Sequence, residues 1–338
     1  MQDVPIDAPR VARAQAQPNI ALVKYWGKRD GALNLPATGS LSVTLKSLWT
    51  RTTVAFDPVF ARDELWRDGP IHGAERERVT AFLDLLRART GSALHARVTT
   101  HNNFPTGAGL ASSASGFAAL ALAGSAALGL ALDARELSVL ARRGSGSAAR
   151  SILGGFVRMD KGSREDGEDA FARQLLDAGQ WPLCVVVAVT STAAKAIGSG
   201  PGMDISRRTS PFHAAWLTGA DDDLAAAEHA VATRDFAALA QVSEHSCLKM
   251  HAVMLASHPA LVYWNGATVE CLHVIRNLRE HDGVGVFFTI DAGPQVKAVC
   301  LPQDVERVAS ALRTVAGVQA VLVSGLGAGA RLSGEDLA

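Results

Sequence analysis

The sequence carries no excess of either charge. Its 338 residues include 33 Lys and Arg side chains and 33 Asp and Glu side chains. Zero net charge gives no general attraction for nucleic acid or for an anionic membrane, so we expect neither as a partner. Any site for an anion must instead be formed locally. The first residues, Met1 to Arg13, lack the apolar core of a secretory signal, and we expect a cytoplasmic protein.

Metal and redox motifs are also missing. The four cysteines stand far apart without a CxxC pair, and no HExxH motif occurs. This spacing argues against a zinc site or a redox dithiol and predicts reduced thiols. His245, His251 and His258 lie six or seven residues apart. We assign no metal to these histidines.

A run long enough to span a membrane is absent. The longest apolar stretch, from Phe117 to Leu132, is shorter than the about 20 residues that a membrane helix needs. Gly124 and Ser125 interrupt it. The stretch therefore predicts a buried helix of a soluble protein.

The sequence does contain helix and strand patterns mixed in both halves. The length predicts two domains, and 48% apolar residues allow a large core. The valine-rich stretch from Leu183 to Val189 predicts a strand buried on both faces. We place the boundary after it, giving domains 1–190 and 191–338, and the mixture of helices and strands in both halves predicts a two-domain α+β or α/β architecture. Other strands are predicted at 41–45, 52–56, 93–100, 154–159, 285–290, 298–301 and 320–323, and helices at 75–90, 134–143, 211–216, 222–234, 236–256, 260–280 and 303–315.

A glycine-rich loop, residues 104–114, lies between a predicted strand and the apolar helix. Gly107 and Gly109 let backbone amides close on an anion, and the first turn of the helix favours negative charge. The hydroxyls of Ser112 and Ser113 can bond phosphate oxygens or Mg²⁺. The loop predicts a triphosphate cradle, and the alternative is a flexible turn with a serine cap. It is neither a Walker A loop nor a dinucleotide motif, because no Gly-Lys-Ser/Thr follows and the third glycine of GxGxxG is missing.

Six blocks of the sequence resemble, in order, those of the diphosphomevalonate decarboxylase family. That family belongs to the superfamily of galactokinase, homoserine kinase, mevalonate kinase and phosphomevalonate kinase. The blocks are Asn19-Ile20-Ala21 with Lys24-Tyr25-Trp26-Gly27-Lys28-Arg29-Asp30, Leu41-Ser42-Val43-Thr44-Leu45, the loop Asn103 to Ala114, the segment Gly144 to Val157, Thr209-Ser210-Pro211, and Asp291-Ala292-Gly293-Pro294.

The resemblance implies a fold and a reaction. It implies a two-domain α+β fold like that of small-molecule kinases. An N-terminal α/β domain would pack on a C-terminal α+β domain, with the active site in the cleft between them, and the protein would form a homodimer. It implies ATP as co-substrate with Mg²⁺. ATP would phosphorylate the tertiary 3-hydroxyl of mevalonate 5-diphosphate. Phosphate would then leave as the carboxylate departs as CO₂, giving isopentenyl diphosphate.

Three residues match the family's catalytic positions. Asp291 would orient or deprotonate the 3-hydroxyl, and the alternative is an ordinary turn aspartate. Arg150 would hold the substrate carboxylate with its planar fork. Lys28, with Tyr25, would contact the phosphate chain. Lys24 would support the same charged cleft, and the alternative for the two lysines is a solvated basic patch.

Further residues match the family's binding positions. Ser145 and Ser147 would bond the carboxylate end of the substrate, and the alternative is a cap for a helix that begins near Ala148. Ser199 and Met203 match two more substrate contacts. We expect no dedicated metal site, and Mg²⁺ would be held through ATP with help from Ser112 or Ser113. The predicted ATP site comprises Pro105, Gly107, Ala108, Gly109, Leu110, Ala111, Ser112 and Ser113.

The sequence departs from the family pattern at several positions. Thr38-Gly39 replaces an Asn-Ser pair, Gly107 stands where Ala is usual, and Gln295 replaces Asn. Gly200 replaces an Arg or Thr that contacts the terminal phosphate. Mevalonate 5-phosphate therefore stays open as the alternative substrate. A 3-kinase without decarboxylation, and a nucleotide-binding regulator with this fold, are the remaining alternatives.

Overall fold

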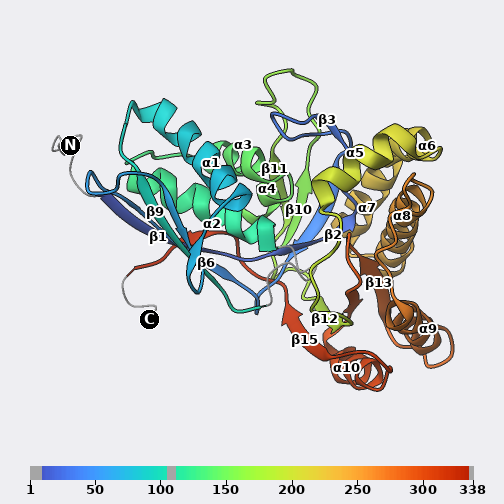
Figure 1. Ribbon diagram of the computed structural model, residues 1–338. Coiled ribbons are helices and arrows are strands. Elements are labelled where there is room, and N and C mark those ends of the chain that lie inside the picture. Colours follow the sequence, from blue (N-terminus) through green and yellow to red (C-terminus); the bar gives the residue numbers. More distant parts are fainter. Residues whose placement is uncertain (1–9, 105–111, 335–338) are drawn as a thin grey trace.

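The first sheet forms the outer part of the N-terminal half (Figure 1). The computed structural model describes residues 10–104 and 112–334. The sheet has the order β16-β1-β6-β9-β7-β8, and its neighbours are antiparallel except β7 and β9. Its strands are β1 (Arg10–Ala16), β6 (Thr50–Phe56), β7 (Glu64–Trp66), β8 (Pro70–Ile71), β9 (Ala96–Asn102) and β16 (Arg331–Leu332).

Helices α1 (Ala74–Thr90) and α2 (Ser112–Ala127) cover one face of this sheet. α2 is the apolar stretch of the sequence. Most of its residues are buried, and many of these are alanines, whose small side chains let the helix approach β1 and β6 closely. A Cβ at Gly124 would press on Leu86 of α1 at 2.6 Å. The predicted buried helix is confirmed, although it begins and ends about five residues earlier. Within the described residues, no helix has the length and apolar character needed to cross a membrane.

A second sheet, in the order β11-β10-β5-β2, continues the N-terminal half. A short ribbon of β3 and β4 follows β2 in the chain. Helices α3 (Ala134–Gly144) and α4 (Ala148–Ser151) contact α2 and the second sheet. The strands are β2 (Asn19–Val23), β3 (Lys28–Asp30), β4 (Leu35–Pro36), β5 (Ser40–Thr44), β10 (Phe156–Met159) and β11 (Ala172–Leu176).

The third sheet, in the order β13-β14-β12-β15, is fully antiparallel. Val185 and Val187 of β12 enter the core shared with the second sheet, whereas Val186 and Ala188 face the core under α9 and α10. The prediction of a strand buried on both faces is therefore confirmed. The elements of this half are β12 (Cys184–Val189), β13 (Val286–Ile290), β14 (Val296–Cys300), β15 (Ala320–Gly325), α5 (Ser199–Thr209), α6 (His213–Thr218), α7 (Ala220–Thr233), α8 (Phe236–Leu255), α9 (Gly266–Glu280), the 3-10 helix η1 (Pro302–Asp304) and α10 (Val305–Arg313).

After β15 the chain crosses back to the first sheet, where β16 pairs with β1 (Figure 1). The crossing passes tightly over the second sheet, since Gly327 N donates to Thr44 O at 2.8 Å. A Cβ at Gly329 would collide with the carbonyl oxygen of Ile152, so this close approach requires glycine. The mixed helix and strand content of both halves confirms the predicted fold class. The division at residue 190 stays a prediction.

One predicted boundary is wrong and one helix was not predicted, each for a local reason. The helix predicted at 260–280 begins at Gly266, because Asn265 and Thr268 form a reciprocal capping box there. Helix α5 was not predicted, because Gly200, Pro201 and Gly202 lie in its first turn. Proline is tolerated in a first turn, where its missing N–H would have no helical partner.

Candidate active site

A cleft of about 730 Å³ is lined by residues from both halves of the chain. It contains every predicted site residue that the structure describes. These are Lys24, Tyr25, Lys28, Ser112, Ser113, Ser145, Ser147, Arg150, Ser199, Met203 and Asp291. The other predicted ATP contacts, Pro105, Gly107, Ala108, Gly109, Leu110 and Ala111, lie outside the described residues.

The cleft is strongly cationic although the whole chain is neutral. Its described lining includes six cationic side chains and a single carboxylate, that of Asp291. Arg78, Arg143 and Lys195 are lining residues that the sequence analysis did not identify. The cationic residues are Lys24, Lys28, Arg78, Arg143, Arg150 and Lys195. Such a lining suits reactants that carry several negative charges.

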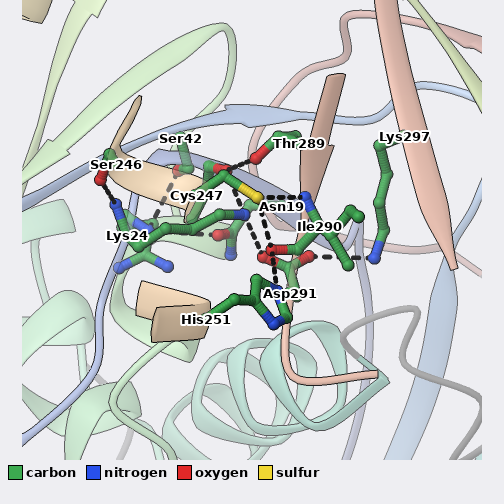
Figure 2. Close-up of polar contacts among 12 residues, drawn as sticks. Asn19, Lys24, Ser42, Ser246, Cys247, His251, Thr289, Ile290, Asp291 and Lys297 are labelled. Carbon is green, nitrogen blue, oxygen red and sulfur yellow. Dashed lines mark hydrogen bonds and ion pairs between the residues drawn. The ribbon is translucent and has the colours of Figure 1, made fainter. Parts of the chain in front are cut away.

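Asp291 follows β13 directly and is held by two buried lysines (Figure 2). Lys24 Nζ lies 2.7 Å from Oδ1, and Lys297 Nζ lies 3.2 Å from Oδ2. Burial raises the pKa of the Asp291 carboxyl, but attraction to Lys24 and Lys297 outweighs burial and lowers that pKa well below its usual range. The carboxyl is therefore ionised throughout the neutral range.

β13, which ends one residue before Asp291, is an edge strand, and α8 covers its outer edge. Phe288 N donates to Glu244 Oε1 at 3.0 Å, and Ile290 N donates to Cys247 Sγ at 3.2 Å. Side chains of α8 thus take the place of a neighbouring strand (Figure 2 shows the Cys247 contact). The end of β13 is held in position up to the residue before Asp291.

The turn that carries Lys24 belongs to the N-terminal half but is held by helices of the other half. Lys24 N donates to Ser246 Oγ of α8 at 3.0 Å. Trp26 Nε1 donates to Ser206 Oγ of α5 at 3.0 Å, and Trp216 Nε1 of α6 donates to Trp26 O at 2.8 Å. These contacts align Lys24 with the carboxylate it meets.

Arg150 lies on α4 and is only 2% exposed. Its Nε donates to Asn19 Oδ1 and Ser42 Oγ, both at 3.1 Å, and its Nη1 donates to Ser40 Oγ at 2.7 Å. Burial lowers the pKa of Arg150 to about 10, partly offset by attraction to Asp291 and Tyr25. The guanidinium therefore stays charged and is fixed in orientation at the wall of the cleft.

Tyr25 and the two serines of the α3–α4 connection lie together. The Tyr25 hydroxyl is buried and has no hydrogen-bond partner among the residues that the structure describes. Burial raises its pKa to about 12, so it remains a donor. Ser145 Oγ lies 3.3 Å from Ser147 Oγ, and the Ser147 side chain makes no capping bond to α4. Because the capping alternative for Ser147 is not observed, its hydroxyl can bond a ligand.

The N-terminus of α5 and the residues before it also line the cleft. Lys195 Nζ donates to Ser199 Oγ and to Ala292 O, each at 3.0 Å. Burial lowers the pKa of Lys195, and attraction to Asp291 opposes that shift. Gly200 also lines the cleft, and a Cβ built there would meet no atom within 4 Å. In residues 10–104 and 112–334, no group of three or more His, Cys, Asp or Glu side chains is arranged to hold a metal.

The chain is similar to known proteins over most of its length. Two family models match consecutive parts of the chain. The diphosphomevalonate decarboxylase-like N-terminal domain matches residues 16–172, and the mevalonate 5-diphosphate decarboxylase C-terminal domain matches residues 185–325. The diphosphomevalonate decarboxylase of Aspergillus fumigatus is 38% identical, covering 90% of this chain and 80% of that protein. The human protein of that name is also 38% identical, covering 87% and 78%.

Solved structures match over nearly the whole chain. Mevalonate diphosphate decarboxylase from Staphylococcus aureus has a TM-score of 0.91 at 36% identity, covering 97% of this chain and 99% of that one. A structure described as MDDEF in complex with MVAPP, AMPPCP and magnesium has a TM-score of 0.90 at 37% identity, covering 96% and 99%. The resemblance of the six sequence blocks is confirmed: the chain belongs to the diphosphomevalonate decarboxylase family.

Proposed function

We propose that this protein converts mevalonate 5-diphosphate to isopentenyl diphosphate, with ATP and Mg²⁺, releasing ADP, phosphate and CO₂. The observation that carries the proposal is an ionised Asp291 held by two lysines in a cationic cleft that also contains the fixed guanidinium of Arg150. Relatives named for this reaction cover most of the chain. One similar structure is described with MVAPP, AMPPCP and magnesium together.

Substrate binding follows from the charges that line the cleft. Lys28 and Tyr25 would contact the diphosphate, with Arg78 close by, since Arg78 affects the pKa of Lys28 electrostatically. Arg150 would hold the carboxylate by charge-assisted hydrogen bonds. Ser145 and Ser147 would complete that end of the site. Ser199 and Met203, on the α5 wall, would contact the rest of the substrate.

Asp291 would accept a hydrogen bond from the 3-hydroxyl and orient its oxygen toward the γ-phosphorus. Its lowered pKa makes the carboxylate a weak base, so proton transfer would occur late, as the O–P bond forms and the hydroxyl becomes acidic. Positioning and charge stabilisation supply most of the catalysis in phosphoryl transfer. Lys24 and Lys195 would add positive charge beside the transferred group.

Decarboxylation then follows from the 3-phospho intermediate. The C3–O bond breaks and phosphate leaves with its electron pair. The C1–C2 bond to the carboxylate breaks as well, its electron pair forms the double bond between C2 and C3, and CO₂ is released. The contact between Arg150 and the carboxylate weakens as the neutral product forms, so Arg150 would orient the group without retaining CO₂.

Mg²⁺ would bind with ATP rather than in a site of its own. Ser112 and Ser113, at the start of α2, line the cleft, and their hydroxyls suit a hard cation that also binds phosphate oxygens. When bound, the ion neutralises charge on the phosphates. The N-terminus of α2 adds favourable dipole charge at the same place.

The test is ATP-dependent release of CO₂ by the purified protein. Mevalonate 5-diphosphate, mevalonate 5-phosphate and mevalonate are compared in parallel. We expect turnover of the diphosphate. Preference for the monophosphate would overturn the proposed substrate. Gly200, which lacks a side chain to contact the terminal phosphate, would then explain the change in substrate. ADP formation without CO₂ would indicate a 3-kinase, and no activity on any substrate would indicate a regulator.

The assembly and location are proposed on the family resemblance. We propose a cytoplasmic homodimer. All four cysteines are free thiols, as a reducing compartment requires. Light scattering coupled to size-exclusion chromatography checks the assembly, and a mass equal to one chain would contradict the dimer.

A further inference from the structure

Lys297 is a buried lysine that no sequence motif identified. It lies on β14, opposite Thr289 of β13, two residues before Asp291. Its side chain is fully buried, and it is not among the residues that line the cleft. Its Nζ nevertheless lies 3.2 Å from Asp291 Oδ2 (Figure 2). Lys297 thus contacts the carboxylate from behind, away from the space where reactants bind.

The two lysines share the two oxygens of one carboxylate. Lys24 Nζ forms an ion pair with Asp291 Oδ1 at 2.7 Å, and Lys297 Nζ forms one with Asp291 Oδ2 at 3.2 Å. Two fixed contacts on opposite oxygens prevent rotation about the Cβ–Cγ bond, which a single ion pair would allow. The orientation of the oxygen that faces the reactants is therefore set by Lys297 as well as by Lys24.

The charge balance also requires an explanation. A single lysine would neutralise Asp291, and a second buried ammonium group is costly to desolvate. Lys24 and Lys297 are 1% and 0% exposed. The other charged groups near Asp291, those of Lys195 and Arg150, are also cationic. This concentration of positive charge around one carboxylate would attract anionic reactants, as a catalytic site does.

We propose that Lys297 is a positioning residue for the reaction, holding Asp291 in one orientation and in its ionised form without touching either reactant. This inference rests on the proposed function, because its assay is the decarboxylation. It assigns a role to a side chain outside the cleft. It also explains why a lysine occupies β14, whose other residues are apolar.

The pH profile separates this role from a structural one. Without Lys297, burial still raises the pKa of Asp291 and only part of the opposing attraction remains, so the pKa rises. The protonated form then accumulates as pH falls, and activity is lost on the acid side. His251 and Cys247 do not obscure this limb, because burial lowers the pKa of His251 to about 3 and raises that of Cys247 to about 11. The titratable and charged groups facing Asp291 are Lys24, Lys195, Cys247, His251, Arg150 and Lys297.

The experiment compares Lys297→Met and Lys297→Gln with the unchanged protein, using kcat and both KM values between pH 5 and pH 9. We expect kcat to fall about 10²-fold at pH 7, the loss associated with a misplaced catalytic group. Both KM values should stay within about twofold. In both variants kcat should also decline toward acid pH, whereas kcat of the unchanged protein should not. Lys249→Met is the matched control, since it breaks the Lys249–Asp223 ion pair outside the cleft, and it should leave the profile unchanged.

Two results would overturn the inference while leaving the proposed function intact. The first is an unchanged kcat and pH profile in both variants while the unchanged protein is active. The second is a loss of kcat that is equal at every pH, as a purely structural defect would give. The Lys297→Gln side chain is one bond shorter and uncharged but keeps a polar N–H donor, so this variant decides between the two roles if Lys297→Met does not fold. An unchanged protein that is inactive on all three mevalonates would instead refute the proposed function.

Discussion

Replacing Asp291 by Asn tests how the buried charges are balanced. The amide has nearly the same shape, but it removes the negative charge between Lys24 and Lys297, which are 1% and 0% exposed. Removing one partner of a buried ion pair costs about 3–5 kcal/mol. The side chain of Asp291 is itself 26% exposed to the cleft, where water can enter, so we expect the lower value, about 3 kcal/mol. Loss of the oriented carboxylate should reduce kcat about 10²–10⁴-fold.

The destabilisation should depend on pH in a defined direction. Burial already lowers the pKa of Lys297 and attraction to Asp291 opposes this, so the pKa falls further in Asp291→Asn. The folded variant then binds fewer protons than the unfolded chain below the normal lysine pKa of about 10.4. Its stability consequently rises with pH, by up to about 1.4 kcal/mol per pH unit for one proton. The stability difference from the unchanged protein should shrink between pH 7 and pH 9.5.

Urea unfolding at those two pH values measures the effect, together with kcat at pH 7. Asp223→Asn is the matched control, because Asp223 pairs with Lys249 at 2.5 Å outside the cleft. The control should cost less than about 1 kcal/mol at both pH values, as partly exposed ion pairs do. An Asp291→Asn variant whose stability deficit is the same at pH 7 and pH 9.5 would refute the argument that buried lysines are left unbalanced.

Two further substitutions test the cleft walls. Gly200→Thr adds a hydroxyl where a Cβ meets nothing within 4 Å, so it should leave stability unharmed and lower KM for mevalonate 5-diphosphate about tenfold, the value of one hydrogen bond to a charged group. Steady-state kinetics checks this, and an unchanged KM would show that the position is remote from the phosphates. Gly146→Ala should displace the Tyr25 ring, since its Cβ would lie 2.8 Å from Tyr25 Cζ. We expect a rise in substrate KM of about tenfold with KM for ATP unchanged, and equal rises in both would contradict a specific role for Tyr25.

The sequence predicted the parts of the site that lie within its short motif blocks. Asp291 and Arg150 stand in such blocks, and both line the cleft. Elements with a strong local pattern, such as the valine-rich β12, were also predicted. Hydrophobic periodicity and turn residues extend over only a few positions, so strands, helices and motif blocks can be identified from a short stretch of sequence.

The supporting contacts could not be predicted in the same way. Lys24 meets Asp291 across 267 residues of chain, and Cys247 meets Ile290 across 43. Such pairings depend on how sheets and helices pack, which no local pattern specifies. One signal was available for Lys297, since it is the only charged residue of the otherwise apolar strand β14. A lysine inside an apolar strand indicates either an exposed position or a buried partner.

The capping of β13 by α8 also restricts how two copies of the chain can associate. An edge strand normally offers its free N–H and C=O groups to a strand of another molecule. Here Glu244 and Cys247 already accept from the outward N–H groups of Phe288 and Ile290. A second subunit therefore cannot extend the third sheet from this side. Extension of the third sheet by a second subunit is left with its opposite edge, β15, where the side chain of Val323 is 40% exposed.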